Sequence, residues 1–339
     1  MTQKPANKSS AKKSPAKKNA AKKAAKKAPK TPQAMAQEMM RVLTSKLGPN
    51  DLIMPEDVNA LLTSLGGPSA TDGLSDEEAD ARDEAQQIAF DAMEAKTEAQ
   101  ALKLAKRALK LDPDCVDALV ILAGIETDSP QQLIDRLQQA VAAGERSLGA
   151  KFIRENKGYF WGLIETRPYM RALAQLAGLL RGVGLNADAI KHYEKILELN
   201  PNDNQGVRDP LVGLYLATGN LDGARKLLQD YEKDGSANIL WARVLYLFLS
   251  GDKPGATAAL ELAREENRFV ELYLSGRKGL PKAMPEMYSP GSEEEAVLVL
   301  DNMSFAWAEH MDASYWLLDQ LKGGTVAKKA PEKPGEWLQ

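Results

Sequence analysis

The chain has 339 residues, of which 44% are hydrophobic, so it can form one large domain or two ordinary ones with a substantial core. No apolar run reaches the roughly 18 residues of a membrane-spanning helix, and the basic amino end lacks the apolar segment of a secretory signal. The single cysteine, Cys115, excludes an internal disulfide and is typical of a reducing compartment. We therefore expect a cytoplasmic protein without a membrane span.

The net charge of −3 conceals a division between a cationic arm and an acidic body. Residues 1–30 contain 11 lysines and no acidic residue, whereas the remaining chain has 33 Lys and Arg against 47 Asp and Glu, a net charge of −14. Lys, Ala and Pro dominate residues 1–33, which contain no large apolar residue after Met1. Such a segment cannot offset its ordering entropy by burial, so we expect a disordered cationic tail.

The repeated Ala-Lys-Lys units of this tail resemble the lysine-rich tails of linker-histone-like and bacterial nucleoid proteins. Tails of that kind neutralise phosphates without reading sequence. The tail therefore predicts non-specific binding of nucleic acid or another polyanion; a solubilising arm, or one folded back on the acidic body, is the alternative. The candidate polyanion-binding residues are Lys12, Lys13, Lys17, Lys18, Lys22, Lys23, Lys26 and Lys27.

Residues 34–75 are expected to form a short helical element followed by a linker. Two amphipathic patterns lie here, over residues 35–46 and 55–65. Pro55 suits a first helical turn, and the Gly-Gly-Pro sequence at 66–68 ends the second pattern. A small helical hairpin, a docking element and a loosely ordered linker all remain open.

Residues 76–321 carry a series of helical hairpins, of which the best formed covers residues 170–203. Its first helix has an apolar stripe with spacings of three and four, and Gly184 ends that helix because glycine takes the left-handed conformation at low cost. Asn200-Pro201 stops the second helix. The residues expected to pack are Leu173, Leu176, Ala177, Leu180, Ala189, Tyr193 and Ile196.

The next hairpin, over residues 205–235, has the same pattern of turn and capping residues one repeat unit later. Gly219 is in phase with Gly184, and either Asn220 or Asp222 caps the second helix. Two such units in tandem resemble tetratricopeptide repeats, whose units are about 34 residues long. The resemblance predicts an all-α, tetratricopeptide-like helical-hairpin solenoid with a disordered Lys/Ala-rich N-terminal tail.

The rest of the repeat region is less regular. Further hairpins are expected near residues 84–112, 115–143 and 237–268. Two final helices over residues 293–321 are expected to cap the solenoid, whose last hairpin would otherwise expose an apolar face, with Trp307 and Trp316 packing together. Residues 322–339 are expected to form a C-terminal tail.

Residues 144–168 interrupt the repeat period with aromatic and basic residues. Residues of these two kinds, interleaved, can stack on bases or peptides, so Tyr159 and Trp161 are candidates for binding a partner. In the alternative interpretation, the aromatic residues cover the junction between two pairs of repeats.

Repeat solenoids usually bind along the concave face lined by their first helices. In the two best units this face carries small residues together with Arg171, Arg181, Arg208 and Asp209. The arginines are candidates for binding a carboxylate or acidic peptide of a protein partner, or they pair with Asp209 or Glu165 of the chain itself. The Lys and Asn pattern of repeats that clamp the acidic ends of chaperones is absent, which argues against that ligand.

The chain contains no catalytic constellation. Its two histidines, His192 and His310, have no Cys or His partner at zinc spacing, and no glycine-rich phosphate loop occurs. Cys115 is expected to be a small structural thiol. We therefore expect no cofactor, no metal and no enzymatic activity.

Three phrases point to a narrower group. GYFWGLIETRPYMRALAQLA, LNPNDNQGVRDPLVGLYLATGN and PEMYSPGSEEEAVLVL resemble a bacterial group of repeat proteins that is similar to the suppression-of-tumorigenicity-seven family. The resemblance covers about residues 84–321 and implies an all-helical repeat fold without an established enzyme activity. The expected function is a non-catalytic scaffold for protein–protein interaction, with nucleic-acid association through the lysine-rich tail as the alternative.

Overall fold

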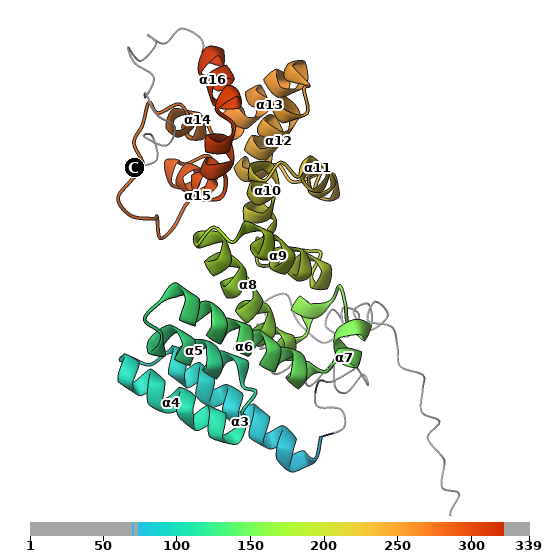
Figure 1. The fold of residues 1–339 in the computed structure, drawn as a ribbon, viewed down its shortest axis with the longest axis vertical. Coiled ribbons are helices and arrows are strands. Elements are labelled where there is room, and N and C mark those ends of the chain that lie inside the picture. The colour runs from blue at the N-terminus through green and yellow to red at the C-terminus, as the bar shows by residue number, and fades with distance from the viewer. Residues whose placement is uncertain (1–69, 71–73, 322–339) are drawn as a thin grey trace, which may run out of the picture.

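The computed structural model describes residue 70 and residues 74–321, which form an all-α solenoid of helical hairpins (Figure 1). No strand occurs within these residues, and the predicted fold class is confirmed for this part of the chain. The predictions for the cationic tail over residues 1–33 with its candidate lysines, for the amphipathic patterns before residue 70, and for residues 322–339 lie outside the described residues.

Five hairpins follow one another, each made of a first and a second helix. They are α3 (Asp76–Met93) with α4 (Glu98–Leu111), α5 (Val116–Glu126) with α6 (Pro130–Leu148), α8 (Arg167–Gly182) with α9 (Asn186–Leu199), α10 (Arg208–Ala217) with α11 (Leu221–Asp230), and α12 (Ala237–Leu249) with α13 (Lys253–Glu266). Figure 1 shows them stacked in chain order. The first helices α3, α5 and α8 contact one another in sequence, and so do α10 and α12.

Local sequence explains where these helices begin and end. Gly184 and Gly219 follow α8 and α10 with φ angles of 80° and 71°, in the left-handed region that glycine adopts without strain. These two predicted turns are confirmed. Of the two capping candidates, Asn220 caps α11, because its side chain accepts a hydrogen bond from the backbone N–H of Gly223 at 2.9 Å.

The insert between the second and third hairpins folds into α7 (Ala150–Glu155) and two short 3-10 helices, η1 (Phe160–Gly162) and η2 (Ile164–Thr166). Phe160 is fully buried and meets Tyr169 edge-on, with the ring centroids 6.4 Å apart. Tyr169 in turn packs against Gly144 of α6, where even a Cβ atom would collide with its ring. These aromatic residues therefore fill the junction between α6 and α8.

Three helices follow the last hairpin: α14 (Phe269–Leu274), which was not predicted, α15 (Glu293–Glu309) and α16 (Met311–Gln320). Helix α15 lies against α10, α12 and α14 (Figure 1). The two tryptophans do not form the expected pair, because each meets a ring on α12. Trp307 lies edge-on to Trp241 at 6.5 Å, and Trp316 lies 5.2 Å from Phe248.

The core runs along the solenoid. A main cluster of buried hydrophobic residues extends from α5 to α16, and a smaller one joins α3, α4 and the start of α5. Small residues stand where the two helices of a hairpin cross, and Ala189, Ala224 and Ala256 are fully buried. Each of the residues expected to pack in the best hairpin is buried: Leu173, Leu176, Ala177, Leu180, Ala189, Tyr193 and Ile196.

Gly213 on α10 allows α15 to come close. A Cβ atom built at Gly213 would lie 2.0 Å from the backbone oxygen of Asn302 on α15. A Cβ atom built at Gly178 on α8 would meet nothing nearer than the hydroxyl of Tyr193, at 3.9 Å. Helix α15 thus requires a glycine beneath it, whereas the corresponding surface of α8 is open.

Alanine at these two glycines should have opposite effects. We expect Gly213→Ala to lower the free energy of unfolding by about 1–3 kcal/mol, because the methyl group would overlap the backbone of α15. Gly178→Ala should raise it by roughly 0.5–1 kcal/mol, because alanine is the better helix former and the site is open. Urea unfolding measures both changes; a Gly213→Ala protein as stable as wild type would contradict the close approach of α15.

Candidate protein-binding site

A ladder of polar side chains joins α3, α5 and α8, the first helices of the first three hairpins. The side-chain amide of Gln86 on α3 donates to the Asp117 carboxylate on α5 at 2.7 Å, and Nε of Arg171 on α8 donates to the same carboxylate at 3.2 Å. Asp117 is only 2% exposed, and a buried carboxylate is costly unless it is paired and hydrogen-bonded. Gln86 and Arg171 supply these partners. We call the surface of α3, α5 and α8 that carries these three residues the ladder face.

Beyond the ladder, this face is apolar and open. Phe90 and Met93 lie about one and two helical turns after Gln86 and remain 39% and 47% exposed. On α5, Gly124 lies two turns after Asp117, and a Cβ atom built there would meet nothing within 4 Å. Exposed apolar side chains beside accessible backbone are typical of an interaction surface.

The equivalent side of α10 and α12 is covered by α15. Arg181, in the last turn of α8, donates to the Asp301 carboxylate at 2.8 Å and to the Asp301 backbone oxygen at 2.7 Å. Just past the C-terminal end of α15, a ring nitrogen of His310 lies 2.8 Å from the backbone oxygen of Leu216. The chain therefore supplies a helix of its own for this side of the solenoid.

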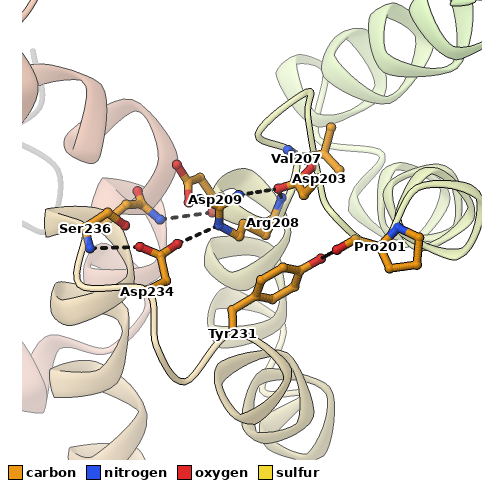
Figure 2. Close-up of polar contacts among 9 residues, drawn as sticks. Pro201, Asp203, Val207, Arg208, Asp209, Tyr231, Asp234 and Ser236 are labelled. Atoms are coloured by element: carbon orange, nitrogen blue, oxygen red, sulfur yellow. Dashed lines mark hydrogen bonds and ion pairs between the residues drawn. The ribbon is translucent and has the colours of Figure 1, made fainter. Parts of the chain in front are cut away.

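Arg208 forms a further ion-pair cluster (Figure 2). Its Nε donates to Asp234 at 2.7 Å and its Nη1 to Asp203 at 3.0 Å, while its guanidinium carbon lies 5.4 Å from the centre of the Tyr231 ring. Asp203 also accepts hydrogen bonds from the backbone N–H groups of Val207, at 2.8 Å, and of Arg208, at 3.0 Å, where α10 begins. Arg208 thereby ties the turn before α10 to the linker between α11 and α12.

The three candidate arginines all have carboxylate partners within the chain. The pairs are Arg171 with Asp117, Arg181 with Asp301, and Arg208 with both Asp203 and Asp234. Internal pairing, one of the two alternatives for these arginines, is therefore present, but the carboxylates in these pairs are not the expected Asp209 and Glu165. An external ligand would have to exchange with these carboxylates, and binding of such a ligand stays a prediction.

Asp209 differs from the other acidic residues of the Arg208 cluster. Its Oδ1 atom is buried and accepts no hydrogen bond within the described residues. Burial raises the pKa of Asp209 to about 7; the attraction of Arg208 opposes this shift, and the neighbouring Asp203 and Asp234 contribute to it. Asp209 therefore holds a proton at pH values where an exposed carboxyl group is ionised.

Tyr159 and Trp161, the aromatic candidates of the insert, lie beside and within η1. Tyr159 is 41% exposed, whereas Trp161 is half-buried. The Arg167 guanidinium lies 5.2 Å from the centre of the Trp161 ring and donates to the Trp161 backbone oxygen at 3.2 Å. One cation thus already stacks on Trp161. Partner binding by these two residues stays a prediction.

A groove of about 1150 Å³ lies between the second helices α9 and α11. Leu211 and Tyr215 of α10 contribute to its lining, together with charged residues of α9 and α11. Several of these charges pair locally, as Lys195 does with Glu198. Because charges of both signs line the groove, it offers no evident preference for a charged ligand.

The described residues contain little reactive chemistry. No group of three or more His, Cys, Asp and Glu side chains among them is placed to hold a metal ion. Cys115 is buried, and burial raises the pKa of its thiol to about 11, so the reactive thiolate is scarce at neutral pH. In this part of the chain, no helix is long and apolar enough to cross a membrane.

The ladder was missed by sequence reasoning, although one signal for it exists. Asp117 stands in the apolar run VDALVILAG, where a carboxylate facing a neighbouring helix needs a partner. That partner, Arg171, follows 54 residues later, and nothing in a single sequence pairs the two positions.

Stability should fall with rising pH because of Asp209. Between its ordinary pKa of 3.8 and its folded value of about 7, the folded chain keeps a proton that the unfolded chain releases. The contribution of Asp209 to the free energy of unfolding therefore falls by up to about 1.4 kcal/mol per pH unit as pH rises through this window. The asparagine of Asp209→Asn cannot ionise, so the free energy of unfolding of this variant should increase relative to that of wild type as pH rises from 5 to about 8.

Urea unfolding at several pH values measures this difference. Asp222→Asn is the matched control, because the Asp222 side chain is 93% exposed on α11 and its substitution should leave the pH dependence unchanged. A constant difference in stability between wild type and Asp209→Asn from pH 5 to 8 would rule out the raised pKa.

Comparison with known proteins identifies the repeat. Residues 180–245, from the end of α8 into α12, match the model of the tetratricopeptide repeat family. No curated protein matches the chain significantly. Among solved structures, the chain is similar to one described as the functional characterization of Pseudomonas aeruginosa pilF, with 20% identity over 56% of this chain and 93% of that one and a TM-score of 0.28, too low to support a structural argument. Residues 180–245 of the chain are therefore similar to the tetratricopeptide repeat.

Proposed function

We propose that the protein is a cytoplasmic, non-catalytic scaffold that binds a protein partner through the ladder face. One observation carries the proposal: α15 packs on the same side of α10 and α12, so this side of a hairpin already accepts a helix within the chain. The ladder face likewise has glycines and apolar side chains on which a helix could pack. Gly124 and Gly178 leave backbone accessible, Phe90 and Met93 are exposed, and no helix of the described part covers them.

The partner that fits this surface best is an amphipathic helix. Such a helix lays its apolar stripe on exposed apolar side chains while its polar side faces water. Phe90 offers a rigid anchor, and Met93 is an unbranched side chain that adapts to different neighbours. A lone, buried cysteine supports a reducing compartment, and the resemblance to the suppression-of-tumorigenicity-seven group supports a scaffold over an enzyme.

Replacing Gly124 by arginine tests the proposal. The variant should fold, because space is open at this position and arginine is a better helix former than glycine. Its side chain would cover the ladder face, so we expect recovery of the protein partner to fall by about tenfold, which corresponds to roughly 1.4 kcal/mol of binding free energy.

The measurement is quantitative affinity purification of the full chain from native cells after nuclease treatment. Leu262→Arg is the matched control, because it adds the same charge at a 55% exposed side chain on α13, away from the ladder face. If the two variants recover the same proteins in equal amounts, the ladder face is not the binding surface.

Polyanion binding by the lysine-rich tail is the second candidate function, favoured by the 11 lysines of residues 1–30. Replacing the eight candidate lysines by glutamine should weaken binding to duplex DNA or RNA and flatten its salt dependence. Each phosphate that the variant no longer neutralises should reduce the slope of log K against log salt by about 0.9 for duplex DNA. Equal affinities and slopes for the wild-type and glutamine chains would exclude the tail as a polyanion-binding element.

A further inference from the structure

The loop between α14 and α15 concentrates exposed apolar side chains. Of the twelve large hydrophobic side chains that are exposed in the described part of the chain, four lie here, namely Leu280, Met284, Met287 and Tyr288. Met287 is 84% exposed. The loop also contains three prolines, at positions 281, 285 and 290. We call residues 279–290 the proline loop, and Figure 1 shows it on the outer side of α14 and α15.

Both ends of the proline loop are fixed to the body of the solenoid. At one end, Lys278 forms an ion pair with Glu293 at the start of α15. At the other end, the backbone N–H of Gly291 donates to the carboxylate of Glu295 at 2.8 Å, and the side-chain amide of Asn267 donates to the same carboxylate at 2.9 Å. Between these anchors, residues 279–288 form no backbone–backbone hydrogen bond within the described residues. The loop therefore combines backbone groups that no helix or turn uses with exposed apolar side chains.

The spacing of these residues matches a polyproline II helix. This helix has three residues per turn and no internal hydrogen bonds, and the φ angle that proline imposes lies within its range. On such a helix every third residue falls in the same row. One row of the loop is entirely apolar and exposed: Pro281, Met284, Met287 and Pro290. Pro285 and Tyr288 lie in the second row, whereas the third row turns polar at Glu286 and Ser289.

We propose that the proline loop is itself a ligand, which binds as a polyproline II segment in a groove lined by aromatic side chains on a partner protein. Grooves of this kind accept proline rings and neighbouring apolar side chains. Met284 and Met287 suit such a groove, because a thioether is adaptable and makes favourable contacts with aromatic rings. The free loop bends at residues 282, 283 and 286, so it must straighten on binding. Its fixed ends limit the entropy that this ordering costs.

The proline loop lies away from the ladder face. It follows α14 near the carboxyl end of the solenoid, whereas the ladder face is on α3, α5 and α8 (Figure 1). The proposal therefore adds a second interaction surface to the scaffold and does not depend on the first.

Two other ligands fit the loop less well. A lipid surface would accept the apolar side chains, and the exposed Arg277 and Lys282 would attract anionic headgroups. The exposed Glu286 and Glu294 oppose this attraction, and a fluid bilayer does not require a spacing of three residues. Addition to the edge of a sheet is disfavoured, because prolines cannot donate the backbone hydrogen bonds of a strand.

Competition with a synthetic peptide tests the proposal. The wild-type full chain is used to recover its protein partners from native cells, and a peptide of residues 278–292 is then added. A polyproline II segment needs no contact with the rest of the chain, so the free peptide should release the partner of the loop. The same peptide carrying Pro285→Gly should compete about threefold less well, because glycine is less preorganised than proline.

Charges placed in the loop of the full chain distinguish the apolar row from its neighbours. Met284→Glu with Met287→Glu should lower recovery of the released partner by about tenfold or more, because a charge is costly in an apolar groove. Ala283→Glu with Ser289→Glu is the matched control, because the same two charges fall in the third row, where recovery should match wild type. All four side chains are exposed, so both variants should fold. Gly124→Arg should leave this recovery unchanged, so the proline loop and the ladder face are tested separately.

Several results would overturn the proposal. They are that the peptide releases no recovered protein, that the Pro285→Gly peptide competes as well as the wild-type peptide, or that the two charged variants recover the partner equally. A further one is that the wild-type chain sediments with vesicles of phosphatidylethanolamine and phosphatidylglycerol while the Met284→Glu, Met287→Glu variant does not, which would indicate a lipid surface as the ligand.

Discussion

Each hairpin of this protein has more apolar surface than its own two helices can cover. The small residues Ala189, Ala224 and Ala256 let the helices of one hairpin cross closely, but the remaining stripes must pack on the next hairpin. The continuous core from α5 to α16 is the result. The same constraint explains the ends: helices α14, α15 and α16 cover surface that the last hairpins would expose, and α3 begins the series with a largely charged outer side.

Polar contacts at the joints set how the hairpins meet. Asp117 receives donors from both neighbouring first helices, and Arg208 bridges the turn before α10 and the linker after α11. A buried ion pair gains little net stability, because desolvation offsets most of its attraction. We infer that these groups act mainly by fixing one arrangement, since a hairpin set differently would leave a buried charge without its partner.

Much of the repeat could be predicted because its signals are local. The stripe from Leu173 to Leu180, the turn at Gly184 and the crossing residue Ala189 are set by spacing within one hairpin. The partners of Arg171 and Arg181 could not be predicted, because Asp117 and Asp301 are 54 and 120 residues distant. Trp307 shows the same limit: its aromatic character was visible, but the ring it meets, Trp241, belongs to another repeat. Helix α14 is too short for its period to be recognised.

The position of α15 has a consequence for how the chain folds. Contacts between neighbouring hairpins are local in sequence, so the hairpins can assemble stepwise from any starting point. Helix α15 needs α10 and α12 to be already in place, and its link to Arg181 closes a loop of 120 residues. Contacts of such long range form slowly. We infer that α15 docks late and turns a series of separable units at the carboxyl end into one cooperative block.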